Sequence, residues 1–202
     1  MNAARPQSSI PSPARVGLFD SGVGGLSVWR ALAALLPEAG YHYVADSIHC
    51  PYGARSADEI RHLSLGISRL LIEQGASIVV VACNTASAAA LEYLRAAFPA
   101  TPFVGMVPAV KPAARATHSG VGGALATPTT FGGQLYHDVV AQFGAGVRVV
   151  SQIGEGLVEQ VEAGDLDGPE TLALLRHCLT PLLDAGADTL VLGCTHYPFL
   201  IP

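Results

Sequence analysis

Two cysteines stand at matching places in the two halves of the sequence. Cys83 follows the apolar residues 79–82, and Cys194 follows a similar run at residues 190–193. Short apolar runs of this kind are typical of buried parallel strands, and ligands of such sheets bind at the carboxyl ends of the strands. Two thiols facing each other there could take a proton from one side of a carbon atom and return one to its other side. Such a transfer inverts the configuration at that carbon.

The other two cysteines do not share this pattern. A single buried cysteine is more often part of the core than a reactive group, so the repetition carries the argument for chemistry. Cys178 lies in a leucine-rich stretch and is expected to pack in the core. Cys50 precedes residues 51–53 and has no predicted chemical role. His49 has no partners at zinc-site spacing, so we expect no metal site.

Seven short apolar runs predict β-strands, and amphipathic stretches with helical periodicity separate them. Alternating strands and helices predict an α/β fold with a mostly parallel sheet and helices on both faces. The expected strands are residues 16–19, 42–44, 77–82, 103–106, 123–126, 147–150 and 189–192.

Three helices can be predicted in more detail. Ser56 and Glu59 form a potential capping box for the first. A second begins just after Cys83, where its N-terminal N–H groups would stabilise a thiolate. Asp167 is a possible N-cap of the third, with Pro169 in its first turn. The expected apolar faces are Ile60, Leu63, Ile67, Leu70 and Leu71 in the first helix, and Leu172, Leu175, Leu179 and Leu182 in the third.

A weak internal repeat predicts two domains. Residues 79–85 resemble residues 190–196, and residues 17–20 resemble residues 124–127 at nearly the same spacing. Two prolines near residue 100 would end a helix between the halves. We therefore predict two pseudo-symmetric α/β domains with parallel sheets, residues 16–99 and 100–202, with the active site in the cleft between them. Residues 1–15 are expected to form a disordered tail.

The composition excludes several classes of protein. The 202 residues include 11 Lys and Arg against 16 Asp and Glu, and the net charge of −5 does not favour a nucleic-acid partner. The longest apolar run, residues 78–83, is far shorter than the roughly 18 residues of a membrane span. The first residues do not resemble a secretion signal, so a reducing cytoplasm is the expected location.

Four sequence blocks in order carry a resemblance to a known family. Residues 20–28, DSGVGGLSV, and residues 51–53, PYG, are followed by residues 82–88, ACNTASA, and residues 192–198, LGCTHYP. Together they resemble the glutamate racemases of the aspartate/glutamate racemase superfamily, from residue 16 to the end of the chain.

The resemblance implies cofactor-independent interconversion of L- and D-glutamate, which supplies D-glutamate for bacterial peptidoglycan. It assigns Cys83 and Cys194 as the proton donor and acceptor pair, facing the α-protons of the D- and L-enantiomers respectively. The implied helpers are Asp20, His196 and Glu162, and Glu155 competes with Glu162 because residues 151–156 lack the family's usual Cys-Pro pair. The implied substrate contacts are Asp20, Ser21, Pro51, Tyr52, Gly53, Asn84, Thr85, Thr127, Thr195 and His196.

Several alternatives remain open at this point. Residues 22–27 with Asp46 imitate a dinucleotide-binding fingerprint, although Ser27 replaces its third glycine. A related substrate such as aspartate or a hydantoin is another alternative. The resemblance also allows a homodimer, and binding to DNA gyrase either in addition to catalysis or as the role of a non-catalytic fragment. Because family members usually continue well beyond residues 192–198, we expect a truncated chain with an incomplete first domain.

Overall fold

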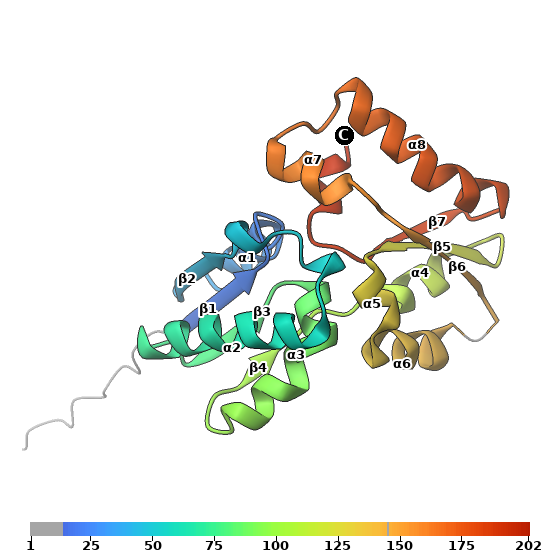
Figure 1. Ribbon diagram of the computed structural model, residues 1–202. Coiled ribbons are helices and arrows are strands. Elements are labelled where there is room, and N and C mark those ends of the chain that lie inside the picture. Colours follow the sequence, from blue (N-terminus) through green and yellow to red (C-terminus); the bar gives the residue numbers. More distant parts are fainter. Residues whose placement is uncertain (1–13, 145) are drawn as a thin grey trace, which may run out of the picture.

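The computed structural model describes residues 14–144 and 146–202. Within them the chain forms two parallel β-sheets that lie side by side, each covered by helices (Figure 1). The predicted α/β class is therefore confirmed. The predicted tail, residues 1–15, lies outside the described residues except for its last two, and the second of these, Arg15, begins strand β1.

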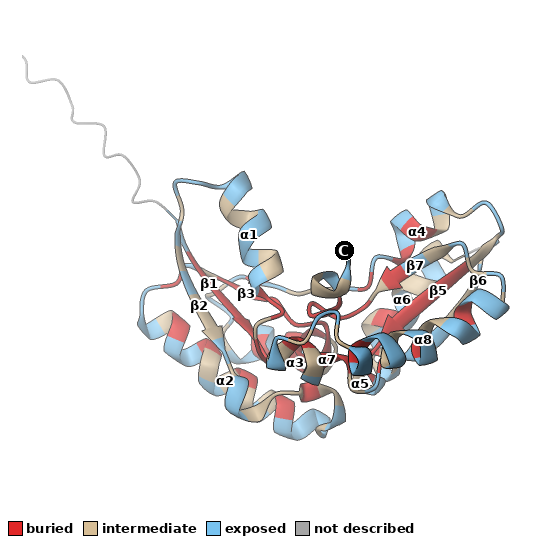
Figure 2. Ribbon diagram, turned by 90° about the horizontal axis from the view of Figure 1, so that it is seen from above, coloured by how far each residue is buried: buried red, intermediate tan, exposed pale blue. Residues whose placement is uncertain are grey.

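The first sheet has the order β2-β1-β3-β4 and is parallel throughout. Its strands are β1 (Arg15–Asp20), β2 (Gly40–Ala45), β3 (Ile78–Val81) and β4 (Phe103–Val104). Alternate residues face opposite sides of the sheet. Phe19 and Val79 pack against α2 (Ala57–Glu73) and α3 (Asn84–Ala97), whereas Leu18 and Val80 pack against α1 (Leu26–Leu35). Helices thus cover both faces, as predicted (Figure 2).

The second sheet has the order β6-β5-β7 and is also parallel. Its strands are β5 (Val121–Ala126), β6 (Arg148–Ile153) and β7 (Thr189–Leu192). On one face Ala124 packs against Ala113 of α4 (Val110–Ala116), and α6 (Gln134–Phe143) lies beside that helix. On the other face Leu125 meets Cys178 of α8 (Pro169–Asp184). The predicted packing role of Cys178 agrees with its complete burial.

Short elements follow the carboxyl ends of the strands and bring the two halves together. They are η1 (Ser47–His49), η2 (Tyr52–Ala54), α5 (Pro128–Gly132), α7 (Leu157–Ala163) and η3 (Tyr197–Leu200). Helix α5 contacts η2 and α3, and α7 contacts η3. A hydrogen bond from Thr195 to Asp20 joins the end of β7 to the end of β1. The carboxyl ends of both sheets therefore meet near the centre of the molecule (Figure 2).

All seven predicted strands are present, and their bounds differ from the predicted ones by at most three residues. β4 ends at Val104, two residues earlier than predicted, because the backbone N–H of Met106 turns away to donate to Ser87 Oγ at 2.8 Å. β4 still pairs with β3. The predicted domain boundary after residue 99 therefore falls before the last strand of the first sheet.

Three details of the predicted helices are wrong. Leu172, on the expected apolar face of the third helix, is 41% exposed. Ser56 does cap α2 by accepting from the N–H of Glu59, but Leu70 is 43% exposed. Two buried serines, Ser64 and Ser68, share the inner face of α2 instead. In α8 the N-cap is Gly168 and not Asp167, because Asp165 reaches forward to accept from the Gly168 N–H. Across residues 14–144 and 146–202, no helix combines the length and apolar character that a membrane span requires.

Candidate active site

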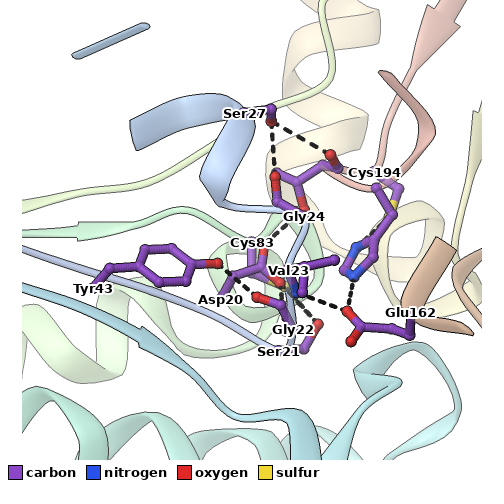
Figure 3. A network of polar contacts seen from close by, with 12 residues as sticks. Asp20, Ser21, Gly22, Val23, Gly24, Ser27, Tyr43, Cys83, Glu162 and Cys194 are labelled. Atoms are coloured by element: carbon purple, nitrogen blue, oxygen red, sulfur yellow. Dashed lines mark hydrogen bonds and ion pairs between the residues drawn. The ribbon is translucent and has the colours of Figure 1, made fainter. Parts of the chain in front are cut away.

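Cys83 lies where β3 ends and α3 begins. It is the N-cap of α3, and its sulfur accepts from the backbone N–H of Ala86 at 3.4 Å, which confirms the predicted helix start. The thiol also reaches the hydroxyl of Ser21 at 3.9 Å, and that hydroxyl donates to Asp20 Oδ1 at 3.0 Å. The side chain of Cys83 is 4% exposed. The contacts therefore form a buried chain from sulfur through hydroxyl to carboxylate (Figure 3).

Cys194 follows β7 and stands at the start of a similar chain. Its sulfur lies 3.7 Å from Nδ1 of His196, whose Nε2 lies 2.6 Å from Oε1 of Glu162 (Figure 3). An ionised carboxylate can only accept, so this contact assigns the ring proton to Nε2 and leaves Nδ1 free to accept. In this tautomer Nδ1 of His196 faces the Cys194 thiol as an acceptor, and the helper role of His196 stays a prediction.

The structure separates the two candidate glutamates. Glu162, on α7, contacts His196 and also accepts from the backbone N–H of Val23 at 2.7 Å. Glu155 precedes α7, is exposed and lines a cavity instead. Of the two, the geometry thus places Glu162 beside the second cysteine.

Asp20 is the buried centre of the site. The side chain is completely buried, and Oδ1 accepts from the Ser21 hydroxyl and from the Gly22 N–H at 2.9 Å. Its other oxygen, Oδ2, accepts from the hydroxyl of Thr195 at 2.6 Å. Because Thr195 adjoins Cys194, this carboxylate connects the surroundings of both cysteines (Figure 3).

The glycine loop after β1 fits closely against the second half of the chain. A Cβ atom on Gly24 would collide with the side chains of Thr195 and His196, and one on Gly22 would collide with Glu162. Glu162 already occupies the Val23 N–H, where a dinucleotide would need to place its pyrophosphate. The dinucleotide alternative is therefore not supported, and the loop's glycines are required for close contact between the halves.

A row of buried threonine hydroxyls continues the polar cluster. Oγ1 of Thr85 lies 2.9 Å from Oγ1 of Thr127, which in turn lies 2.9 Å from Oγ1 of Thr130. Thr127 also caps α5 by accepting from the Thr130 N–H. The sequence analysis missed Thr130, although a threonine three residues after an N-cap threonine was a usable signal. Asn84 is also buried, at the first residue of α3.

Residues 51–53, which the resemblance implies as substrate contacts, lie where the two halves of the chain meet. Tyr52 is buried and donates to Asp46 Oδ2 at 2.5 Å, and the carbonyl of Gly53 accepts from Thr129 at 3.0 Å. Pro51, Gly53 and Thr127 line a cavity of 360 Å³ that α7 borders on its other side. Tyr43, which the sequence analysis missed, donates to the Gly22 carbonyl at 2.6 Å and supports the glycine loop from β2.

Comparison with known proteins identifies the family. The sequence profile of the Asp/Glu/Hydantoin racemase family matches residues 25–202. The chain belongs to this racemase family. Racemases are isomerases, so the chain is an enzyme of that class.

Two curated relatives support the same assignment. The chain is 61% identical over 187 residues to the glutamate racemase of Roseiflexus sp. strain RS-1, which covers 93% of this chain and 69% of that relative. It is 53% identical to the glutamate racemase of Pseudomonas aeruginosa strain PAO1, which covers 94% of this chain and 71% of that relative. The chain thus spans about 70% of the length of these racemases.

Solved racemase structures share the fold. Escherichia coli glutamate racemase, in complex with L-glutamate and the activator UDP-MurNAc-ala, superposes with a TM-score of 0.83 at 40% identity, covering 93% of this chain and 71% of that one. Francisella tularensis glutamate racemase in complex with D-glutamate has a TM-score of 0.79 at 28% identity, with 94% and 71% covered. The two-sheet architecture is therefore that of glutamate racemases.

Burial governs the protonation of both candidate cysteines of this racemase. Burial, reinforced by the negative charge of Asp20, raises the pKa of Cys83 to about 12, although N–H donors of Ala86 and Ser21 act in the opposite direction. Burial also raises the pKa of Cys194 well above its ordinary value. The predicted stabilisation of a thiolate by the α3 N-terminus is present but outweighed, so both sulfurs rest as thiols near neutral pH.

The raised pKa of Cys83 predicts a loss of stability at alkaline pH. Between about pH 9 and pH 12 the folded protein retains the thiol proton while the unfolded chain releases it, so the free energy of unfolding falls as pH rises through this window. Below pH 9 this contribution is fully present. The Cys83→Ser variant lacks this contribution. The slope of its free energy of unfolding against pH should therefore be shallower than that of the wild type by roughly 1 kcal/mol per pH unit.

Urea denaturation at several pH values in this window measures the effect. Thr180→Ser, at an exposed position of α8, is the control and should keep the slope of the wild type. Equal slopes for Cys83→Ser and the wild type would contradict the assigned pKa.

Proposed function

We propose that this racemase interconverts L-glutamate and D-glutamate by a two-thiol proton transfer that needs no cofactor. The observation that carries the proposal is the convergence of Cys83 and Cys194. Each follows a strand of a different sheet. Cys83 connects through Ser21 to Asp20, and Cys194 adjoins Thr195, which donates to the same carboxylate. Relatives solved with L-glutamate and with D-glutamate support the choice of substrate.

The proposed reaction moves one proton in and one proton out. One sulfur, as a thiolate, takes the α-proton and becomes a thiol, and the pair of electrons stays on the substrate as an enolate-like carbanion. The opposite thiol then gives its proton to the other face of the same carbon and becomes a thiolate. Cys83 serves the D-enantiomer and Cys194 the L-enantiomer, as the family resemblance implies. The two sulfurs exchange roles in the reverse direction, so the reaction needs no external acid or base.

Each thiol has its own polar chain through which its proton can leave. Cys83 connects through Ser21 to Asp20, whose own pKa is raised by burial. Cys194 connects through His196 to Glu162. A substrate ammonium group beside Asp20 would offset the charge that raises the pKa of Cys83, which favours the thiolate when substrate binds. The two chains are built from different residues, so proton exchange at each sulfur can be altered separately.

The surrounding donors suit a carboxylate substrate. The hydroxyls of Thr85 and Thr127 and the amide of Asn84 are buried, as is the N-terminus of α3, whereas the Thr195 hydroxyl already donates to Asp20. Donors held in place by their own hydrogen bonds stabilise the negative charge that develops on the α-carboxylate when the proton leaves.

We place this reaction in the cytoplasm, as a source of D-glutamate for peptidoglycan. All four cysteines are free thiols, which supports a reducing compartment. The homodimer and the DNA gyrase contact that the resemblance allows stay predictions, and no observation here favours a second function.

Solvent isotope exchange tests the proposed activity. The reduced chain, without added cofactor, is incubated in heavy water with L-glutamate and, separately, with D-glutamate. Each enantiomer should racemise and acquire deuterium at the α-carbon. Aspartate is the matched substrate control and should exchange much more slowly. Exchange with aspartate alone would identify aspartate as the substrate in place of glutamate. No exchange with either enantiomer of glutamate would contradict the proposal.

Serine variants of the two cysteines test the two-thiol mechanism. Cys83→Ser and Cys194→Ser should each slow racemisation at least about 1,000-fold, because a serine hydroxyl is a far weaker acid near neutral pH. Cys83→Ser should still introduce deuterium into L-glutamate, and Cys194→Ser into D-glutamate. Cys178→Ser is the control, with a rate near that of the wild type and a lower melting temperature. Full activity in either active-site variant would exclude the mechanism.

The two glutamates provide a separate test of the Cys194 chain. Glu162→Gln removes the carboxylate that holds His196, so racemisation should slow roughly 100-fold from both enantiomers, because both directions use Cys194. The neighbouring Glu155→Gln should remain within about twofold of the wild type, since that side chain is exposed. Initial rates from each enantiomer measure both effects. The reverse order of sensitivity would assign the helper role to Glu155.

A further inference from the structure

Cys50 has no part in the proposed reaction, yet it lies beside two residues that do. One ligand atom each from Cys50, Glu162 and His196 lie within 4.8 Å of one another. The three residues come from three segments: the loop before η2, helix α7 and the loop after β7. A Cβ atom placed on Gly22 would meet both the Glu162 carboxylate and the Cys50 sulfur. The missing side chain of Gly22 therefore allows the Glu162 carboxylate and the Cys50 sulfur to approach the glycine loop and each other.

The three donors suit a thiophilic divalent cation. Sulfur, imidazole nitrogen and carboxylate oxygen are the ligands of protein zinc sites, with metal–ligand distances of about 2.0–2.3 Å. A tetrahedral site with such distances places its donor atoms roughly 3.5 Å apart. Side-chain rotations that move the donor atoms by about 1 Å would therefore bring the three residues into contact with one metal ion. Three protein ligands leave the fourth position for water.

A cavity gives this cluster access to solvent. It has a volume of 240 Å³ and is lined by Ser47, Pro51, Val158 and Glu159 together with Cys50 and Glu162. It is large enough for a hydrated cation and a bound water. Glu159 lies one helical turn before Glu162 on α7 and adds a second carboxylate to the wall. Its charge attracts cations toward the cluster.

We propose that Cys50, Glu162 and His196 form an inhibitory site for a thiophilic divalent cation such as Zn²⁺. The Cys50 thiol gives its proton to solvent as the metal binds, and the thiolate becomes the sulfur ligand. The sequence analysis expected no metal site because these residues are far apart in the chain and show no zinc-site spacing.

The inhibition, unlike the binding, rests on the proposed function. A metal at this site takes His196 and Glu162 out of their mutual hydrogen bond, so the chain that receives the Cys194 proton is broken. Zn²⁺ therefore slows racemisation reversibly, and a chelator restores it. Cys50 is the ligand that can be altered without touching that chain.

Binding of Zn²⁺ alone, measured in competition with a chromophoric chelator, tests the site without reference to activity. The reduced wild-type chain should bind Zn²⁺ with a measurable affinity, and Cys50→Ala and Cys50→Ser should bind it at least about 100-fold more weakly, because loss of a direct ligand costs more than the 10- to 100-fold loss of an outer partner. Cys178→Ala removes a buried thiol elsewhere and should bind like the wild type. Unaltered Zn²⁺ affinity in both Cys50 variants, or no binding by the wild type, would overturn the proposal.

Activity assays with the same variants complete the test. Cys50→Ser, whose fold is checked by its melting curve without metal, should racemise glutamate at the basal rate and resist Zn²⁺ concentrations that inhibit the wild type and Cys178→Ala. Equal inhibition of Cys50→Ser and the wild type would show that Zn²⁺ acts at the other thiols and would overturn the inhibitory role. If the wild type lacks racemase activity but binds Zn²⁺ through Cys50, the proposed function fails while the metal site stands.

Discussion

A buried carboxylate holds the two halves of this racemase in register. Asp20 ends β1 of the first sheet with its side chain completely buried, and it accepts a 2.6 Å hydrogen bond from Thr195 at the end of β7 in the second. A buried charge is costly unless donors surround it, so the Ser21, Gly22 and Thr195 donors must all stay in place. That requirement closes the glycine loop onto Glu162 and His196, and the close contact leaves no room for a side chain at Gly24.

The same burial determines the chemistry. Cys83 and Cys194 are removed from water and share the field of Asp20, so their pKa values are raised although the α3 N-terminus favours the Cys83 thiolate. A thiol with such a raised pKa keeps its proton near neutral pH, and a positive charge brought close to it favours the reactive thiolate. The site is therefore suited to a substrate that carries its own ammonium group. Each sulfur also has a separate polar chain, Ser21–Asp20 or His196–Glu162, along which its proton can move.

Shared residues link catalysis to the inferred cation site. Glu162 holds the Val23 N–H of the glycine loop and the ring of His196 at the same time, and its carboxylate also faces Cys50. One side chain thus holds the two halves of the chain together, orients the imidazole of His196 and takes part in the inferred binding of a metal. A cation that captures this carboxylate competes with the hydrogen bond between Glu162 and His196, the residue next to the Cys194 thiol.

The sequence by itself determined the strands, the parallel α/β class, the start of α3 at Cys83 and the pairing of the two cysteines. These features follow from local apolar periodicity, a capping position and a repeated block, all of which are readable from neighbouring residues. It predicted α2 but placed Leu70 inside, because periodicity alone cannot show that Ser64 and Ser68 share the inner face. Only the tertiary structure showed that Glu162 and not Glu155 contacts His196. It also tied Asp20 to Thr195 and brought Cys50 beside His196. Those contacts join segments far apart in the chain, and their geometry depends on how the two sheets meet rather than on any local pattern.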